Sequence, residues 1–211
     1  MATKSDFIAF MRDADVLRFG EFVTKSGRQS PYFVNTGLYR TGAHISKLAE
    51  HYAQLVAESG EKFDALFGPA YKGIPLVAVT AAELYRAHGI DTPYFFNRKE
   101  TKDHGEGGNL VGYAPKSGDR VAIIEDVVTA GTAVRESIDL LTPLGVTITA
   151  LFVSVDRAER GTGAVSALQE LRDTYNISVY PIVTARDILE NLEESDRHRA
   201  AMERYLAEYG A

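Results

Sequence analysis

Hydrophobic and polar positions along this chain predict strands that alternate with helices. Short apolar runs rich in β-branched or aromatic residues predict strands over 63–67, 93–96, 121–127, 147–155 and 177–183. Apolar residues at helical spacing predict helices over 74–87, 132–143 and 164–173. This alternation is typical of an α/β fold in which helices cover both faces of a parallel sheet. Ligands of such sheets bind beyond the carboxyl ends of the strands.

The segments on either side of this region have a different pattern. Before it, we expect a helix over 5–17, two short strands over 19–23 and 31–35, and a helix over 44–59. After it, from residue 185, the spacing predicts one or two amphipathic helices. We therefore expect one domain over 1–211, with a core sheet over 60–185 and an N-terminal extension over 1–40.

The overall composition excludes several classes of function. The 211 residues carry a formal net charge of −6, which argues against a broad surface for nucleic acid or acidic membranes. Cysteine is absent, so disulfides, thiolate metal ligands and thiol nucleophiles are excluded. The sequence has no apolar run as long as a membrane span and no apolar signal core at its N-terminus. We expect a cytoplasmic protein that binds neither nucleic acid nor membrane.

The segment over 120–135 has the most specific chemistry. Glu125 and Asp126 follow a buried strand, the small residues of 129–133 come next, and a helix is predicted to begin near Thr132. Backbone N–H groups of such a loop and the positive end of the helix bind phosphate. The two carboxylates suit the vicinal hydroxyls of a sugar. The alternative is an ordinary strand–loop–helix connection with a solvated acidic pair.

Two further segments bring cations to the ends of strands. Gly68 and Gly73 bracket a tight turn that contains Tyr71 and Lys72, and this turn suits a pyrophosphate; the alternative is a plain strand-to-helix turn. The polar, glycine-rich segment over 97–112 carries Arg98, Lys99, Lys102 and His104. We expect a flexible loop whose cations close over a polyanion, or alternatively a solvated loop of mixed charge. One histidine is thin support for a metal site.

A third group of candidates suits a planar anionic ring. Arg157 follows the strand predicted over 147–155, and its guanidinium can hold a carboxylate with two parallel hydrogen bonds. The N-terminal hairpin adds Lys25, Arg28, Tyr32 and Phe33. The alternative for Arg157 is an exposed arginine, with a local ion pair invited by Glu159 and Arg160 beside it.

Five segments together resemble the bacterial orotate phosphoribosyltransferases, which belong to the type I phosphoribosyltransferases: 25–33, 67–75, 97–112, 123–133 and 156–161. The resemblance implies the type I fold, a parallel sheet with a small N-terminal hood. It implies a glycosyltransferase (pentosyltransferase) of pyrimidine biosynthesis that joins orotate to 5-phosphoribosyl 1-diphosphate (PRPP), giving orotidine 5′-monophosphate and diphosphate. It also implies Mg²⁺ as cofactor and a homodimer in which the catalytic loop closes over the neighbouring subunit's site.

The resemblance assigns roles to individual residues. Those implied to bind PRPP are Lys25, Tyr71, Lys72, Arg98, Lys99, Lys102, His104, Glu125, Asp126, Val127, Val128, Thr129, Ala130, Gly131, Thr132 and Ala133. Those implied to bind orotate are Lys25, Phe33, Val34, Thr129 and Arg157. Those implied in catalysis are Arg98, Lys99, Lys102, His104, Lys72 and Asp126. No direct protein ligand is expected for Mg²⁺, which would be held by PRPP and water.

Two positions depart from the pattern of the family, and two other functions compete. The acidic pair is Glu125–Asp126 where two aspartates are common, and Val34 stands where a second phenylalanine is frequent. A phosphoribosyltransferase for another base is disfavoured by Arg157 and the Lys25 hairpin, which suit an anionic ring. A non-catalytic PRPP sensor is disfavoured by the complete cationic loop and the acidic chain.

Overall fold

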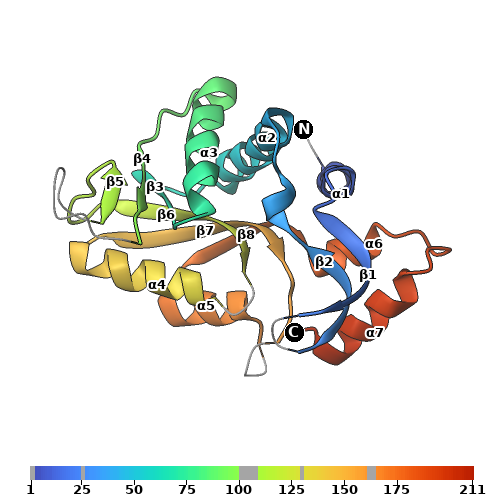
Figure 1. Cartoon of the computed structure of the whole chain (residues 1–211). Helices are drawn as coiled ribbons and strands as arrows, with labels where there is room; N and C mark the ends of the chain where they lie inside the picture. Colours follow the sequence, from blue (N-terminus) through green and yellow to red (C-terminus); the bar gives the residue numbers. More distant parts are fainter. Residues whose placement is uncertain (1–2, 25–26, 100–108, 129–130, 161–164) are drawn as a thin grey trace.

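The computed structural model describes residues 3–24, 27–99, 109–128, 131–160 and 165–211. Its six-stranded sheet has the order β5-β4-β3-β6-β7-β8 (Figure 1). The strands are β3 (Ala65–Gly68), β4 (Tyr94–Asn97), β5 (Leu110–Gly112), β6 (Arg120–Val128), β7 (Thr147–Asp156) and β8 (Ser178–Thr184). All neighbours pair in parallel except β4 and β5. The predicted α/β fold is confirmed, with an antiparallel edge strand that the sequence pattern did not predict.

Helices cover both faces of this sheet. One face packs on α2 (Gly42–Ser59) and α3 (Gly73–His88), and the other on α4 (Thr132–Leu141) and α5 (Ala167–Tyr175) (Figure 1). Alternate side chains of β6 serve the two faces: Ala122 and Ile124 lie in the first core, Val121 and Ile123 in the second. This alternation follows from the two-residue period of a strand. It explains why β6 reads as an uninterrupted apolar run.

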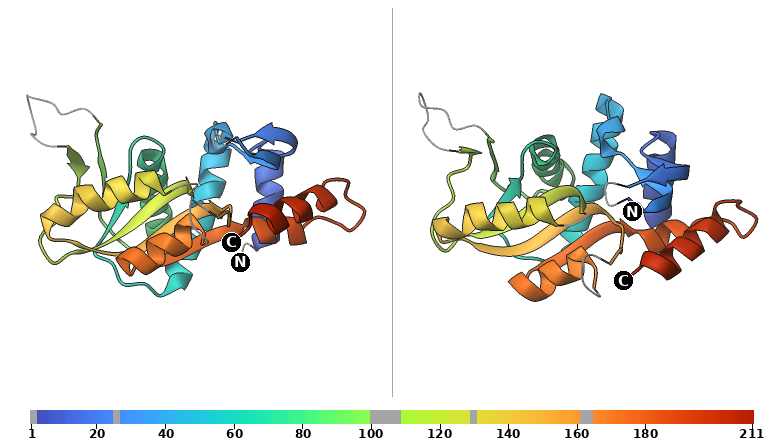
Figure 2. Two further views of the ribbon diagram at one scale, coloured as in Figure 1. Left: turned by 90° about the horizontal axis from the view of Figure 1, so that it is seen from below. Right: turned by 60° about the horizontal axis from the view of Figure 1, so that its bottom comes forward.

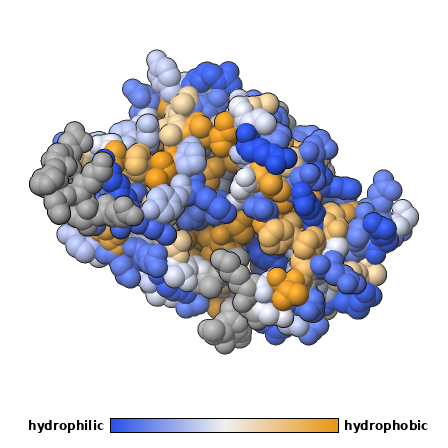
Figure 3. All heavy atoms as spheres, in the orientation of Figure 1, coloured by the Kyte–Doolittle hydropathy of each residue, from blue (hydrophilic) through white to orange (hydrophobic). Residues whose placement is uncertain are grey.

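The N-terminal and C-terminal segments pack together at one end of the sheet. The hairpin of β1 (Leu17–Val23) and β2 (Gln29–Val34) is antiparallel, as predicted. It lies near α1 (Lys4–Asp13), α6 (Ala185–Glu190) and α7 (Arg199–Tyr209), and the two further views of Figure 2 show the same grouping. Two 3₁₀ turns, η1 (Thr36–Leu38) and η2 (Thr142–Leu144), complete the elements. On the face seen in Figure 3, hydrophobic residues gather toward the middle and hydrophilic residues surround them.

Two expected boundaries were wrong. The first helix was expected to reach residue 17, but α1 ends at Asp13 because Asp15 adopts a left-handed conformation, with a φ of 61°, and Leu17 begins β1. The polar segment predicted as a loop over 97–112 is bounded by strand at both ends. Asn97 belongs to β4 and pairs with Leu110 of β5, and the Arg98 N–H donates to the Asn109 carbonyl at 2.7 Å.

Candidate active site

The loop after β3 is shaped by two glycines that approach each other closely. A Cβ atom on Gly68 would lie 2.2 Å from the carbonyl oxygen of Gly73, and one on Gly73 would lie 2.6 Å from Pro69 Cδ. The Ala70 N–H donates to Asn97 Oδ1 at 2.8 Å, which fixes the loop to the end of β4. Glycine is therefore required for contact between the loop and the first turn of α3, and this contact places Lys72 beside β6.

Lys72 forms an ion pair with Asp126 across the ends of two neighbouring parallel strands. Lys72 Nζ lies 2.8 Å from Asp126 Oδ2, and the Thr36 hydroxyl donates to the same oxygen at 2.5 Å. Lys72 Nζ also donates to the Thr36 oxygen at 3.0 Å, so the three groups form a closed triangle. The Lys72 side chain is 59% exposed and that of Asp126 only 12%. A buried acid thus faces a cation that an anionic ligand can reach from solvent.

The two carboxylates of the acidic pair have opposite electrostatic environments. Burial and repulsion by Asp126 raise the pKa of Glu125 well above its ordinary value. Burial also acts on Asp126, but hydrogen bonds from Lys72 and Thr36 outweigh it and hold its pKa below the ordinary value. Glu125 accepts from the Asp126 N–H at 2.9 Å, and its carbonyl accepts from the Tyr52 hydroxyl at 2.6 Å. Near neutral pH the pair therefore holds one proton and one negative charge.

A helix N-terminus follows the acidic pair, as predicted. Gly131 adopts a φ of 75° and caps α4, which begins at Thr132. Its unpaired N–H groups and positive end of the dipole suit a phosphate. The preceding Thr129 and Ala130, predicted to bind the same phosphate, lie outside the described residues.

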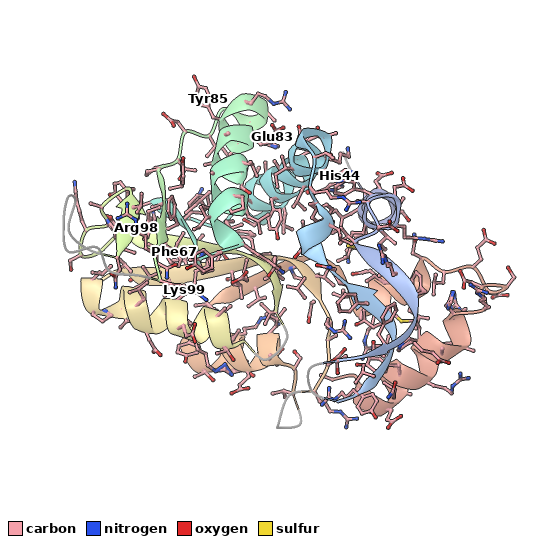
Figure 4. All side chains as sticks on the ribbon, in the orientation of Figure 1. His44, Phe67, Glu83, Tyr85, Arg98 and Lys99 are labelled. Carbon is pink, nitrogen blue, oxygen red and sulfur yellow. The ribbon has the colours of Figure 1, made fainter. Side chains whose placement is uncertain are left out.

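The predicted cationic loop is described only at its ends. Arg98 and Lys99 follow β4 (Figure 4), and Lys99 Nζ lies 5.3 Å from the centre of the Tyr71 ring. Two predicted site residues from different loops, Tyr71 and Lys99, are therefore brought together. Lys102 and His104 lie outside the described residues.

Arg157 is not the exposed arginine of the alternative interpretation, since the residue is only 7% exposed. Its Nη2 donates to Ser30 Oγ at 3.2 Å, and its guanidinium carbon lies 4.3 Å from the centre of the Tyr32 ring. The local ion pair is present, with Nη2 2.6 Å from Glu159 Oε1. Burial disfavours the charged guanidinium, but Tyr32 and Glu159 outweigh this and raise the pKa of Arg157 above its ordinary value.

The other predicted contacts of the base lie on the hairpin. Phe33 is 40% exposed and stacks on Phe22 with 5.4 Å between ring centres, while Val34 is partly buried against the core. Lys25 lies outside the described residues. The hairpin lies beside the carboxyl end of β7 (Figure 1), where Arg157 meets Ser30.

The sequence pattern missed several polar residues that complete these clusters. Thr36 belongs to no motif, and neither do Tyr52 and Tyr205, whose hydroxyls donate to Glu125 and Glu159. A cavity of about 160 Å³ adjoins the Lys72–Asp126 pair and is lined by residues of η1, α2 and α3 together with Ser154. Of the residues that line this cavity, only Lys72 and Asp126 were candidates in the sequence.

Comparison with known proteins identifies the family. The phosphoribosyl transferase domain family matches residues 35–168. The chain is 51% identical over 210 residues to the orotate phosphoribosyltransferase of Thioalkalivibrio sulfidiphilus, with 98% of each chain covered, and 50% identical over 207 residues to that of Escherichia coli, with 97% of this chain and 96% of the other covered. The chain belongs to the orotate phosphoribosyltransferase family. The predicted family and enzyme class are confirmed.

The structure agrees with this membership. The orotate phosphoribosyltransferase of Francisella tularensis superposes with a TM-score of 0.87 at 42% identity, covering 97% of this chain and 99% of the other. Leishmania donovani UMP synthase superposes with a TM-score of 0.77 at 25% identity, where this chain covers 42% of that protein. The general domain match begins at residue 35, so the hairpin and α7 lie outside it, whereas the orotate phosphoribosyltransferases match nearly the whole chain.

The described residues also bear on metal and membrane partners. No group of three or more histidine or acidic residues there is arranged to hold a metal ion. The hard oxygen donors that are present, from Asp126 and Thr36, fit a Mg²⁺ ion held mainly by a ligand's phosphates and water. Within the same residues, no helix is both long and apolar enough to cross a membrane.

Proposed function

We propose that this enzyme transfers the phosphoribosyl group of PRPP to orotate and releases diphosphate, in the synthesis of pyrimidine nucleotides. The Lys72–Asp126 ion pair at the carboxyl ends of β3 and β6 carries the proposal, because it puts a mobile cation beside a buried carboxylate. A diphosphate attracts Lys72, and the released Asp126 then accepts hydrogen bonds from the ribose hydroxyls. Glu125 completes the diol site, and the N-terminus of α4 receives the 5′-phosphate.

The reaction needs charge stabilisation rather than a protein nucleophile. As the diphosphate departs, the ribosyl carbon gains oxocarbenium character and negative charge grows on the leaving group. Lys72, Lys99 and Lys102 stabilise that growing charge, and His104 hydrogen-bonds to the diphosphate or donates a proton to it. When bound, Mg²⁺ offsets part of the same negative charge. Orotate attacks through its ring nitrogen.

The part of the site that binds the base is built around Arg157. Arg157 holds the carboxylate of orotate, and Lys25, Phe33, Val34 and Thr129 surround the ring or its junction with PRPP. An almost fully buried guanidinium is a strong anchor for a carboxylate, since water does not compete for it. This feature favours orotate over neutral pyrimidines and purines.

The assay that tests the proposal follows orotate absorbance with PRPP and Mg²⁺, with uracil and hypoxanthine as parallel acceptors. We expect loss of orotate that depends on both PRPP and Mg²⁺, and no turnover of the other bases. Turnover of another base instead would move the assignment to that base. Binding of PRPP without turnover of any base would favour the PRPP sensor.

A homodimer with shared active sites and a cytoplasmic location are also proposed. A Lys102→Ala variant should turn over slowly, because a cation near the leaving group is lost. Mixing this variant with an inactive Arg157 variant should restore activity if the loop and the base site of one active centre come from different chains. No recovery, with mixed dimers demonstrated by mass, would contradict shared sites.

A further inference from the structure

Arg157 is held by parts of the chain that are far apart in sequence. Ser30 and Tyr32 come from β2 of the hairpin, and Glu159 follows two residues after Arg157 itself. The ring of Tyr32 covers one face of the guanidinium, so the plane of the guanidinium is fixed. The position of Arg157 therefore depends on what orients Glu159.

A single oxygen of Glu159 accepts two hydrogen bonds and makes a further ion-pair contact. Its Oε1 lies 2.8 Å from Arg157 Nε and 2.6 Å from Arg157 Nη2, and the Tyr205 hydroxyl donates to the same oxygen at 2.8 Å. This geometry occupies the Nε–Nη2 edge of the guanidinium. Among the described residues, Nη1 of Arg157 donates to no partner, so this nitrogen remains for a ligand.

The cluster keeps a positive charge despite this pairing. The second oxygen of Glu159 lies 3.5 Å from Nη1 of Arg28, a further cation from the turn of the hairpin. Arg157, Arg28 and Glu159 together carry one net positive charge, in side chains that are at most 24% exposed. The neighbouring Asp156 adds a carboxyl group whose pKa is raised by burial. A poorly hydrated site with this charge prefers an anionic ligand to a neutral one.

The backbone fixes Tyr205 relative to Glu159. Tyr205 lies on α7 and is only 4% exposed. Beyond the end of α7, the Ala211 N–H donates to the Ala158 carbonyl at 2.8 Å, and the Arg160 N–H donates to the Tyr209 carbonyl at 2.8 Å. These bonds join the end of the chain to the segment that carries Glu159.

We propose that Glu159 and Tyr205 are positioning residues that set the preference of this enzyme for an anionic base. The hydroxyl of Tyr205 orients Glu159, Glu159 fixes one edge of Arg157, and the remaining Nη1 meets the carboxylate of the base. The C-terminal helix α7 thereby takes part in base recognition, although it lies outside the general domain match over 35–168. The inference rests on the proposed function, since it requires that Arg157 binds orotate.

The test is a Tyr205→Phe variant, which removes one hydroxyl and keeps the ring. The expected result is a KM for orotate raised about tenfold, as for the loss of one hydrogen bond to a charged group, with the KM for PRPP unchanged. Tyr180→Phe is the matched control, because the Tyr180 hydroxyl also donates to a glutamate, Glu61, at 2.8 Å. An equal rise of both KM values, or of the orotate KM in the control, would overturn the inference.

A double-mutant cycle separates positioning from a general structural role. If Tyr205 acts through Glu159, Tyr205→Phe should not change the KM for orotate further in a Glu159→Ala background. Glu159→Leu, which also removes the acceptor, is the substitute where the alanine variant is unfolded at the assay temperature. If Tyr205→Phe raised the KM for orotate by the same factor in the wild-type enzyme and in the Glu159 variant, the proposal would be contradicted. A wild-type enzyme that does not use orotate would instead refute the proposed function, so the two failures are distinguishable.

Discussion

Two ion pairs at the same edge of the sheet differ in how tightly the protein holds the cation. Lys72 has a side chain 59% exposed and pairs with a buried aspartate, whereas the side chain of Arg157 is only 8% exposed and its glutamate partner 15%. A lysine on a flexible stem can leave its partner for an incoming phosphate, while a stacked, planar arginine is fixed before the ligand arrives. The lysine suits a diphosphate that departs during the reaction, and the fixed arginine suits a base that must be recognised.

Both pairs lie within the matched domain, but the residues that support them differ in origin. Lys72 and Asp126 lie within the domain match over 35–168. Arg157 and Glu159 lie within it as well, whereas Ser30, Tyr32 and Tyr205, which contact this pair, come from the hairpin and α7 outside the match. We infer that the domain shared by the wider family supplies the phosphoribosyl site and Arg157, and that the added segments fix the orientation of Arg157.

Removal of the fixed cation should have the largest effect. An Arg157→Leu variant should lose about 10³-fold in kcat/KM for orotate and about 3–5 kcal/mol of stability, because Glu159 is left buried with less compensation. Arg157→Lys keeps the charge without the planar fork, so it should retain stability better than activity. Steady-state kinetics and urea unfolding check both. An Arg157→Leu variant with normal stability and activity would show that the Arg157–Glu159 ion pair contributes no more than an ion pair exposed to solvent.

Loss of the mobile cation should affect catalysis more than stability. A Lys72→Ala variant should lose about 10²-fold in kcat/KM for PRPP, the effect of removing one group that stabilises developing negative charge. The free energy of unfolding should fall by about 1 kcal/mol, less than in Arg157→Leu, because Thr36 still donates to Asp126 and water reaches the site from the exposed lysine side. A stability loss as large as that of Arg157→Leu would erase the contrast between the two pairs.

The stability of the acidic pair beside Lys72 should depend on pH. The pKa of Glu125 rises from 4.5 in the unfolded chain to about 8 in the folded protein. Between pH 4.5 and pH 8 the folded protein therefore binds a proton at Glu125 that the unfolded chain has released. Its contribution to stability is present below pH 4.5 and is lost as the pH rises toward 8. Glu125→Gln should therefore raise the melting temperature by more at pH 8 than at pH 5. A pH-independent effect would mean that Glu125 is ionised throughout.

The order of strands and helices was predictable because each element has its own apolar period, but elements defined by long-range contact were not. The edge strand β5 has three residues within a polar, glycine-rich segment, and only its pairing with β4 makes it a strand. The acidic pair and Lys72 were found because they stand in compact strings. Thr36 contacts Asp126 across 90 positions and Tyr205 contacts Glu159 across 46, so no local pattern marks either residue.

The smallest expected effect concerns Thr36, which holds the Lys72–Asp126 pair together. Thr36→Val keeps the shape of the side chain but removes the hydrogen bond to Asp126 and the acceptor for Lys72, both of which favour the charged pair. We expect the KM for PRPP to rise by about threefold with little change in the KM for orotate. This is less than a hydrogen bond to a charged group contributes, because Lys72 and Asp126 keep their direct contact. Thr36→Ser should restore the wild-type value, and Thr149→Val, which removes a buried hydroxyl that has no partner among the described residues, is the control. A change in Thr36→Val that serine does not rescue would assign the effect to packing, and the lysine end of the site would then be set by shape, unlike the hydrogen-bonded arginine end.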